Sequence, residues 1–152
     1  MVALIMLLRP PRERLIIKEF MSLHIIIETI PHNQQRYDTV GDWQFKQVNG
    51  ETHLHIKISA MNDWHQELPV AVHELIEAYL CKEHGIDEKD VDRWDTYFEN
   101  ANLESINCIT EPGEHPQAPY YEEHFIATNI ERILVSVLGT KWYDYEKIIN
   151  SL

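Results

Sequence analysis

The sequence predicts an α+β fold in which a small antiparallel sheet of about three strands precedes three to four helices. Between residues 23 and 59, apolar residues cluster or alternate as they do in β-strands. From residue 68 onward they recur with the period of an α-helix. Strands followed by helices is the order typical of the α+β class, whereas regular alternation would indicate a parallel sheet.

Three segments are predicted as strands. Residues 23–30 (LHIIIETI) are rich in β-branched side chains, and residues 42–48 form a second apolar-polar run. Residues 53–59 (HLHIKIS) alternate apolar and polar side chains. The dipeptide Asn49-Gly50 between the last two runs is a strong signal for a tight turn, so a hairpin is expected there.

The helices are delimited by capping residues. Asp63 and Asp87 are typical N-caps, and Gly85 and Gly139 are typical residues after a helix end. The residues from 106 to 119 contain several prolines and are expected to form a loop. The predicted helices cover residues 68–84, 87–102, 120–138 and 142–152.

The chain length of 152 residues fits a single domain, expected over residues 21–152. The apolar run Val2 to Leu8 is too short to span a bilayer, and Arg9 follows it where a signal peptide would have a small-residue cleavage site. We interpret residues 1–20 as an extension from a misassigned start. The alternative, a native N-terminal strand or helix, stays open.

The charge balance limits the partners. The formal net charge is -12, with 25 acidic residues against 13 Lys and Arg, and such a chain repels phosphate backbones. We therefore expect no binding to nucleic acid, apart from the alternative of an acidic DNA mimic, and no membrane association. The two cysteines, Cys81 and Cys108, form no disulfide framework, which favours a cytoplasmic location.

The helix at residues 68–84 carries a candidate metal-binding motif. His73 and Glu77 are four residues apart, so their side chains lie above one another on one face of the helix. An imidazole and a carboxylate in this arrangement suit Zn²⁺ or another first-row divalent metal. The ordinary alternative is that His73, Glu74 and Glu77 form a solvated polar face opposite the apolar face.

The helix at residues 120–138 offers a further candidate ligand. Its apolar face consists of Ile126, Ile130, Ile133, Leu134 and Val137. His124, Thr128 and Glu131 form a polar stripe beside that face. A polar stripe next to a buried face is a suitable place for a ligand, although a half-exposed polar edge would have the same pattern.

Three segments resemble small zincin-like proteins of phage and prophage genomes. The segments are Ala71 to Ala78 (AVHELIEA), Val91 to Asp95 (VDRWD) and Ala118 to His124 (APYYEEH). In zincins a strand precedes a helix that bears the motif HExxH, and a later helix supplies the third metal ligand. This chain departs from the pattern because Glu77 replaces the second histidine.

The resemblance implies a metal-dependent hydrolase of peptide or amide bonds, with a protein or peptide as substrate. His73, Glu77 and His124 would hold the metal, and Glu74 would act as general base. Two histidines and one carboxylate is a catalytic zinc set, and it also suits non-haem Fe(II). The alternative function is a non-catalytic acidic phage accessory protein that binds a host protein. A metal-free structural domain is a third reading.

Other residues have weaker assignments. Tyr120 or Tyr121 would donate a hydrogen bond to an oxyanion. Asp92 and Asp95 are read as helix-start charges or solvated residues, with the orientation of a ligating imidazole as the alternative. The polar loop at residues 111–117 could gate the site, and it contains His115 as a further ligand candidate. His53 and His55 lie on one face of a strand, as a metal-binding pair or as plain exposed residues.

Overall fold

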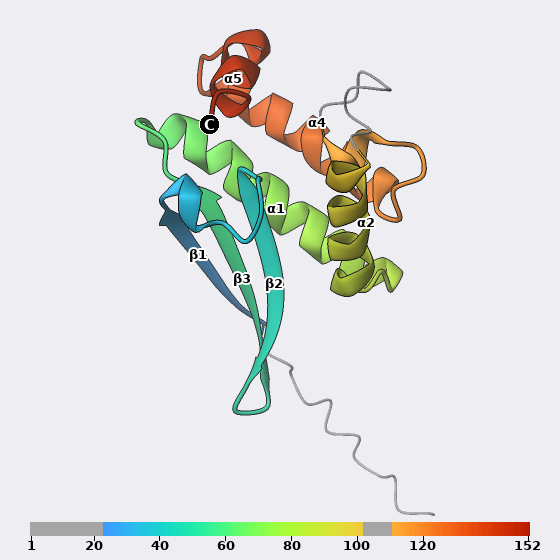
Figure 1. Ribbon diagram of the computed structural model, residues 1–152. Helices are drawn as coiled ribbons and strands as arrows, with labels where there is room; N and C mark the ends of the chain where they lie inside the picture. The colour runs from blue at the N-terminus through green and yellow to red at the C-terminus, as the bar shows by residue number, and fades with distance from the viewer. Residues whose placement is uncertain (1–22, 102–110) are drawn as a thin grey trace, which may run out of the picture.

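The computed structural model describes residues 23–101 and 111–152. The predicted α+β class is confirmed: a three-stranded sheet is followed by four α-helices in the described residues (Figure 1). The strands are β1 (Leu23–Ile30), β2 (Gly41–Val48) and β3 (Glu51–Ser59). The helices are α1 (Trp64–His84), α2 (Glu88–Asn100), α4 (Tyr121–Val137) and α5 (Trp142–Ile149), with short 3-10 turns η1 (His32–Gln34) and η2 (Pro112–Glu114).

The hairpin between β2 and β3 forms where the turn dipeptide predicts it. Val48 is the register partner of Glu51, so Asn49 and Gly50 alone make the connection. Both have positive φ angles, 52° and 87°, as a type I′ turn requires. Asparagine and glycine are the residues that adopt this conformation at the lowest cost.

The prediction of a fully antiparallel sheet is wrong for β1. The strand order is β1-β3-β2, and β1 pairs with β3 in parallel, so the sheet is mixed. Residues 31–40 carry the chain from one sheet edge to the other across the end of β3. Backbone hydrogen bonds of 2.7 Å hold this crossing, from Ser59 N–H to the Val40 carbonyl and from Ala60 N–H to the Ile30 carbonyl.

The caps of the first two helices match their predictions. Asp63 accepts a hydrogen bond from the backbone N–H of His65, and α1 therefore begins at Trp64, four residues before the predicted start. Helix α1 ends at Gly85, whose φ of 74° is the left-handed conformation that favours glycine. Asp87 caps α2 in the same way, through Lys89 N–H.

The fold has three layers, with α1 in the middle. One face of α1 packs on β2 and β3, over the fully buried side chains of Leu54 and Ile56. Helix α4 packs along another side of α1, and α5 follows at its end (Figure 1). Few contacts link α1 to β1, and the inward-facing Ile25 and Ile27 stay about half exposed.

The amphipathic patterns of α1 and α4 predicted only part of what is buried. In α1 the predicted apolar face is packed at Ala71 and Ala78, but His73 and Glu77 of the polar face are buried as well. In α4, His124 and Glu131 are buried between the helices, whereas part of the predicted apolar core face points to solvent: Ile133 is 62% and Val137 is 76% exposed. We call Ile126, Ile130, Ile133 and Val137 the apolar α4 stripe. The cause is that the polar groups of α1 and α4 satisfy one another, as described below.

Several predictions fall on residues outside the described part. These include the extension at residues 1–20, Cys108 and residues 106–110 of the predicted loop. Within the described ranges, none of the helices combines the length and the apolar character needed to cross a membrane.

Candidate metal centre

Three buried side chains converge between α1 and α4, as predicted. His73 and Glu77 come from α1, and His124 comes from the first turn of α4. His73 Nε2 lies 3.2 Å from His124 Nδ1 and 3.4 Å from Glu77 Oε2. The third edge, from His124 Nδ1 to Glu77 Oε2, measures 2.9 Å. This group could hold a metal ion.

The three distances fit the donor set of a small divalent cation. Bonds of about 2.0–2.1 Å in a tetrahedral site place neighbouring ligand atoms about 3.3 Å apart. The observed edges span 2.9 to 3.4 Å. Two imidazole nitrogens and one carboxylate oxygen therefore already have about the separation that one shared ion needs, without movement of the helices.

The tautomer of His73 is fixed from outside this triangle. Glu131 on α4 accepts a hydrogen bond of 2.9 Å from His73 Nδ1, which leaves Nε2 directed at the other ligand atoms. Tyr145 on α5 donates to the second oxygen of Glu131. Asp92 and Asp95, which the sequence offered as one alternative for this orienting role, do not contact an imidazole: Asp95 bonds Tyr120 and Tyr37, and Asp92 bonds Arg36.

Glu77 is oriented from the sheet. The indole N–H of Trp43, on β2, donates a hydrogen bond of 2.9 Å to Glu77 Oε1. The other oxygen, Oε2, faces the two histidines. Trp43 is buried and separated from Glu77 by 34 positions, so no local sequence pattern indicates this contact.

Two glycines allow the walls of the site to come close. A Cβ atom on Gly113, in η2, would lie 2.6 Å from His124 Nδ1. A Cβ atom on Gly41, at the start of β2, would lie 2.6 Å from the Glu74 carboxyl carbon. Any larger residue at either position would displace a functional side chain, which explains why the chain has glycine there.

The far side of His124 faces Glu111. His124 Nε2 lies 3.1 Å from Glu111 Oε2, within ion-pair distance, but it has no partner with hydrogen-bond geometry. Buried ring nitrogens are normally paired, and the Glu111 carboxylate is the group within reach of this one. Glu111 was not predicted as a site residue.

Without a metal, the site holds protons. Burial acts to lower the pKa of His73, but Glu131 and Glu77 outweigh it and raise that pKa well above 6.5. For His124, burial is outweighed by Glu111 and Glu77, and its pKa rises to about 9. Burial acts to raise the pKa of Glu77, but the two imidazoles hold it below its usual range. Imidazolium protons thus supply the positive charge that a cation would replace.

Glu74 lies beside the triangle and lines the same cavity. Burial and the nearby Glu77 carboxylate raise its pKa well above 4.5. A bound cation would counter both effects, because it stabilises a nearby negative charge. Glu74 is therefore placed to exchange a proton close to the ligand atoms without being one of them.

A second polar group adjoins the site on α2. Asp95 is buried and accepts a hydrogen bond of 2.6 Å from the Tyr120 hydroxyl and one of 3.4 Å from Tyr37. Burial raises the pKa of Asp95 to about 7. Tyr120, a predicted oxyanion donor, thus uses its hydroxyl on Asp95, whereas Tyr121 is partly exposed. Asp92 instead pairs with Arg36.

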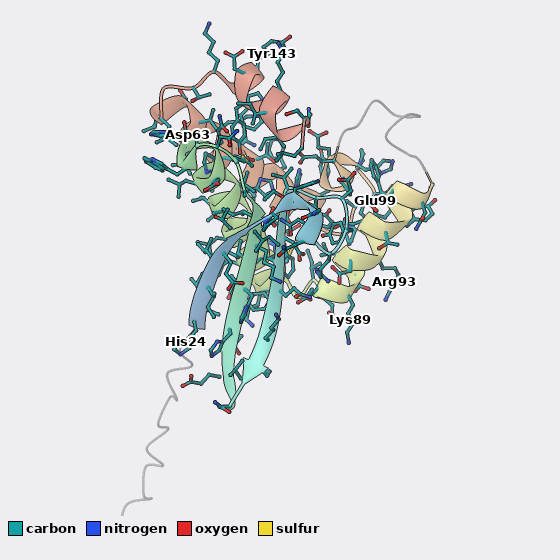
Figure 2. The ribbon with its side chains drawn as sticks, turned by 60° about the vertical axis from the view of Figure 1, so that its left-hand side comes forward. His24, Asp63, Lys89, Arg93, Glu99 and Tyr143 are labelled. Carbon is teal, nitrogen blue, oxygen red and sulfur yellow. The ribbon has the colours of Figure 1, made fainter. Side chains whose placement is uncertain are left out.

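The site opens into a cavity of about 470 Å³. The lining is rich in carboxylates, and within the described residues no Lys or Arg lines it. Lys89 and Arg93 project from the outer side of α2 (Figure 2). Arg36 compensates two of these carboxylates, Asp42 and Asp92, and the remaining negative charge favours cations over anions. The acidic lining residues are Asp38, Asp42, Glu74, Glu77, Glu88, Asp92, Asp95, Glu99, Glu111 and Glu131.

The remaining histidine candidates lie elsewhere. His115 accepts a hydrogen bond from Gln117 N–H and lies against Trp94, away from the three ligands. His53 and His55 lie on the sheet face opposite α1, where they do not meet His73 or His124. Thr128 bonds the backbone carbonyl of His124 and offers no ligand.

Comparisons with known proteins do not assign the chain to a family. No protein-family model, no curated protein and no solved structure matches it. The function must therefore be argued from the geometry of the site.

Proposed function

We propose that this protein is a zincin-like, metal-dependent hydrolase of peptide or amide bonds. The observation that carries the proposal is the convergence of His73, Glu77 and His124, with mutual distances of 2.9 to 3.4 Å. Zn²⁺, or another first-row divalent ion, suits two imidazoles and a carboxylate. The cytoplasm is the proposed location, and a protein or peptide the proposed substrate.

In this proposal a bound metal ion supplies Lewis-acid chemistry, polarising a carbonyl group and making water more acidic. The residues of the chain supply the rest. Glu131 and Trp43 fix the directions of the His73 and Glu77 ligand atoms. Glu74, beside the ligands, takes a proton from the attacking water and passes it to the leaving amine. The acidic cavity favours a neutral or cationic peptide over an acidic one.

Elemental analysis of protein purified without an affinity tag tests the metal. We expect a divalent transition metal that remains bound after gel filtration, and we expect it to be absent from His73→Ala and His124→Ala. Retention of the metal in both variants would refute the assignment of these ligands. Thermal unfolding of wild-type protein with and without a chelator checks that the metal stabilises the fold.

Hydrolysis is tested separately, with a fluorogenic peptide library and the variant Glu74→Gln. We expect Glu74→Gln to keep its metal and to lose roughly 10²- to 10⁴-fold in rate, as removal of a general base does. Glu83→Gln, on the same helix, is the matched control and should keep full activity. A fully active Glu74→Gln protein would refute the general-base role.

The second candidate is a non-catalytic accessory protein of phage type that binds a host protein. The observation that favours it is the apolar α4 stripe, of which Ile126, Ile133 and Val137 are exposed on a strongly acidic chain. Stoichiometric metal without hydrolysis of any library peptide by the wild-type protein would support this candidate over the hydrolase.

A further inference from the structure

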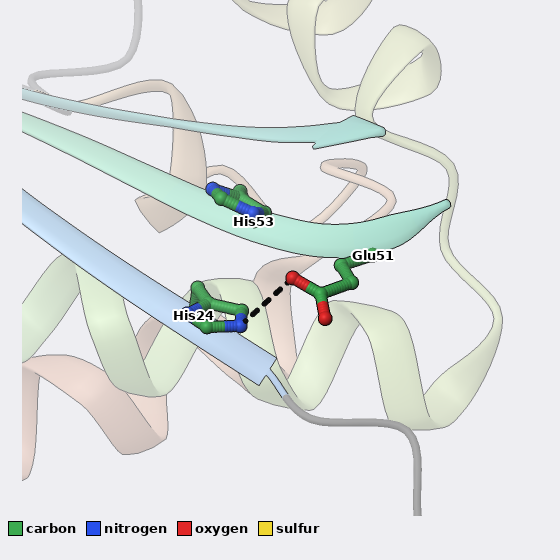
Figure 3. A group of neighbouring side chains, drawn as sticks. All are labelled: His24, Glu51 and His53. Carbon is green, nitrogen blue, oxygen red and sulfur yellow. Dashed lines mark ion pairs between the residues drawn. The ribbon is translucent and has the colours of Figure 1, made fainter. Parts of the chain in front are cut away.

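A second group of metal-binding side chains lies on the opposite side of the sheet, near the hairpin. His24 comes from β1, and Glu51 and His53 come from β3 (Figure 3). We propose that these three residues form an exposed site for an imidazole-preferring divalent ion: Zn²⁺, Ni²⁺ or Cu²⁺. This inference is independent of the proposed hydrolase function, because it shares no residue with the buried centre.

The strand register brings the residues together. His24 and His53 are direct partners in the parallel β1–β3 pairing, so their side chains point to the same face. Their rings are stacked, with centroids 4.7 Å apart. Glu51 precedes His53 by two positions and shares that face, immediately after the tight turn at Asn49-Gly50. The backbone positions of Glu51 and His53 are fixed by the hairpin and the central strand β3, and that of His24 by the parallel pairing of β1 with β3.

The donor atoms are close enough to share one ion. His24 Nε2 lies 3.2 Å from Glu51 Oε2, the contact drawn in Figure 3. One ligand atom from each of the three residues lies within 4.8 Å of the other two. A tetrahedral ion needs ligand atoms about 3.3 Å apart. Rotation of the exposed side chains closes the difference, without any change in the strands.

The surroundings set the affinity below that of the buried centre. The His24 and Glu51 side chains are 47% and 55% exposed, against 9% and 6% for His73 and Glu77. Water therefore competes for the ion, and Lys46, the β2 partner of His53, adds an opposing positive charge. The chain as a whole carries a net charge of -12, which attracts cations. The expected behaviour is rapid, reversible binding.

The sequence pattern drew attention to this face through His53 and His55 and did not indicate His24. His53 and His55 are two residues apart on β3, and their ring centroids are 6.2 Å apart. The His24 ring is nearer to the His53 ring, and His24 Nε2 also lies 3.2 Å from Glu51 Oε2. The partner of His53 comes from a strand 29 positions away in sequence, which pairs in the parallel orientation that the sequence did not indicate.

Calorimetric titration of the full, untagged chain tests the proposal. The protein is first loaded with one equivalent of Zn²⁺ and then titrated with Ni²⁺. We expect one further equivalent to bind to wild-type protein, and we expect His24→Ala and His53→Ala each to weaken this step by at least about tenfold. His65→Ala is the matched control, because His65 is another exposed histidine within 2.8 Å of a carboxylate, Asp63. It should bind like wild type.

Nuclear magnetic resonance locates the ion independently of the variants. Paramagnetic Ni²⁺ should broaden the ring signals of His24 and His53 at substoichiometric concentration, before those of His65. Circular dichroism of each variant verifies its fold. Unchanged Ni²⁺ binding in both His24→Ala and His53→Ala, or first broadening at His65, would overturn the proposal. Loss of the tightly bound metal in His73→Ala bears only on the buried centre.

Discussion

Replacing Asp95 by asparagine should stabilise the protein at alkaline pH and leave it almost unchanged at acidic pH. The folded state raises the pKa of Asp95 from 3.8 to about 7. Because the folded pKa lies above the unfolded one, the folded state binds the proton more tightly. Stability is therefore lost as the pH rises from about 4 to about 7, and the loss is complete above that range.

The size of this stabilisation follows from the difference between the folded and unfolded pKa values of Asp95. About three pKa units correspond to roughly 4 kcal/mol at 1.36 kcal/mol per unit. Asparagine keeps an acceptor for the Tyr120 hydroxyl and, like the protonated acid, carries no charge. The gain at pH 8 is therefore about 4 kcal/mol, which for a domain of this size raises Tm by roughly 8–16 °C.

Thermal unfolding of wild type and Asp95→Asn at pH 4 and pH 8 measures this difference. Asp90→Asn is the control, because Asp90 lies on the exposed face of the same helix and pairs only with Arg93 among the described residues. It should shift Tm by less than about 2 °C at either pH. A Tm difference for Asp95→Asn that is equal at both pH values would refute the assignment of a raised pKa to Asp95.

Three further predictions concern the metal centre. Gly113→Ala should destabilise the protein by about 1–3 kcal/mol and weaken metal binding, because the added methyl group would clash with the His124 ring. Chemical denaturation measures the loss of stability, and metal titration measures the loss of affinity. Trp43→Phe should weaken metal binding about 10- to 100-fold by removing the hydrogen bond to Glu77, and an unchanged affinity would contradict the orienting role. Metal affinity should rise with pH up to about 9, because the pKa values of His73 and His124 are raised and both imidazoles must lose a proton when the metal binds. A metal affinity that stays constant from pH 6 to 9 would contradict this.

Local sequence signals predicted the elements of the fold well. The turn at Asn49-Gly50 and the helix end at Gly85 each depend on the backbone conformation of one or two residues. The identity of those residues indicates that conformation directly. The direction of β1 depends instead on how residues 31–40 cross the sheet. Hydrogen bonds between distant segments decide that crossing, and no periodicity encodes them.

The candidate site was predicted in part. The spacing of His73 and Glu77 and the polar stripe containing His124 and Glu131 were visible in the sequence, and these four side chains meet. The amphipathic pattern left a solvated polar face open as the ordinary alternative, because periodicity identifies two faces and does not show which is buried. Trp43 joins the site through a contact across the fold that has no local signature.

The apolar α4 stripe determines how copies of this protein behave toward one another in solution. Its four residues are spaced by four, three and four positions, the repeat that lets two helices interlock along a seam. At physiological ionic strength the Debye length is about 8 Å, so the mutual repulsion of two chains with a net charge of -12 acts only at short range. Added salt shortens that range further and leaves the attraction between exposed isoleucines intact. Self-association through this stripe should therefore increase with ionic strength.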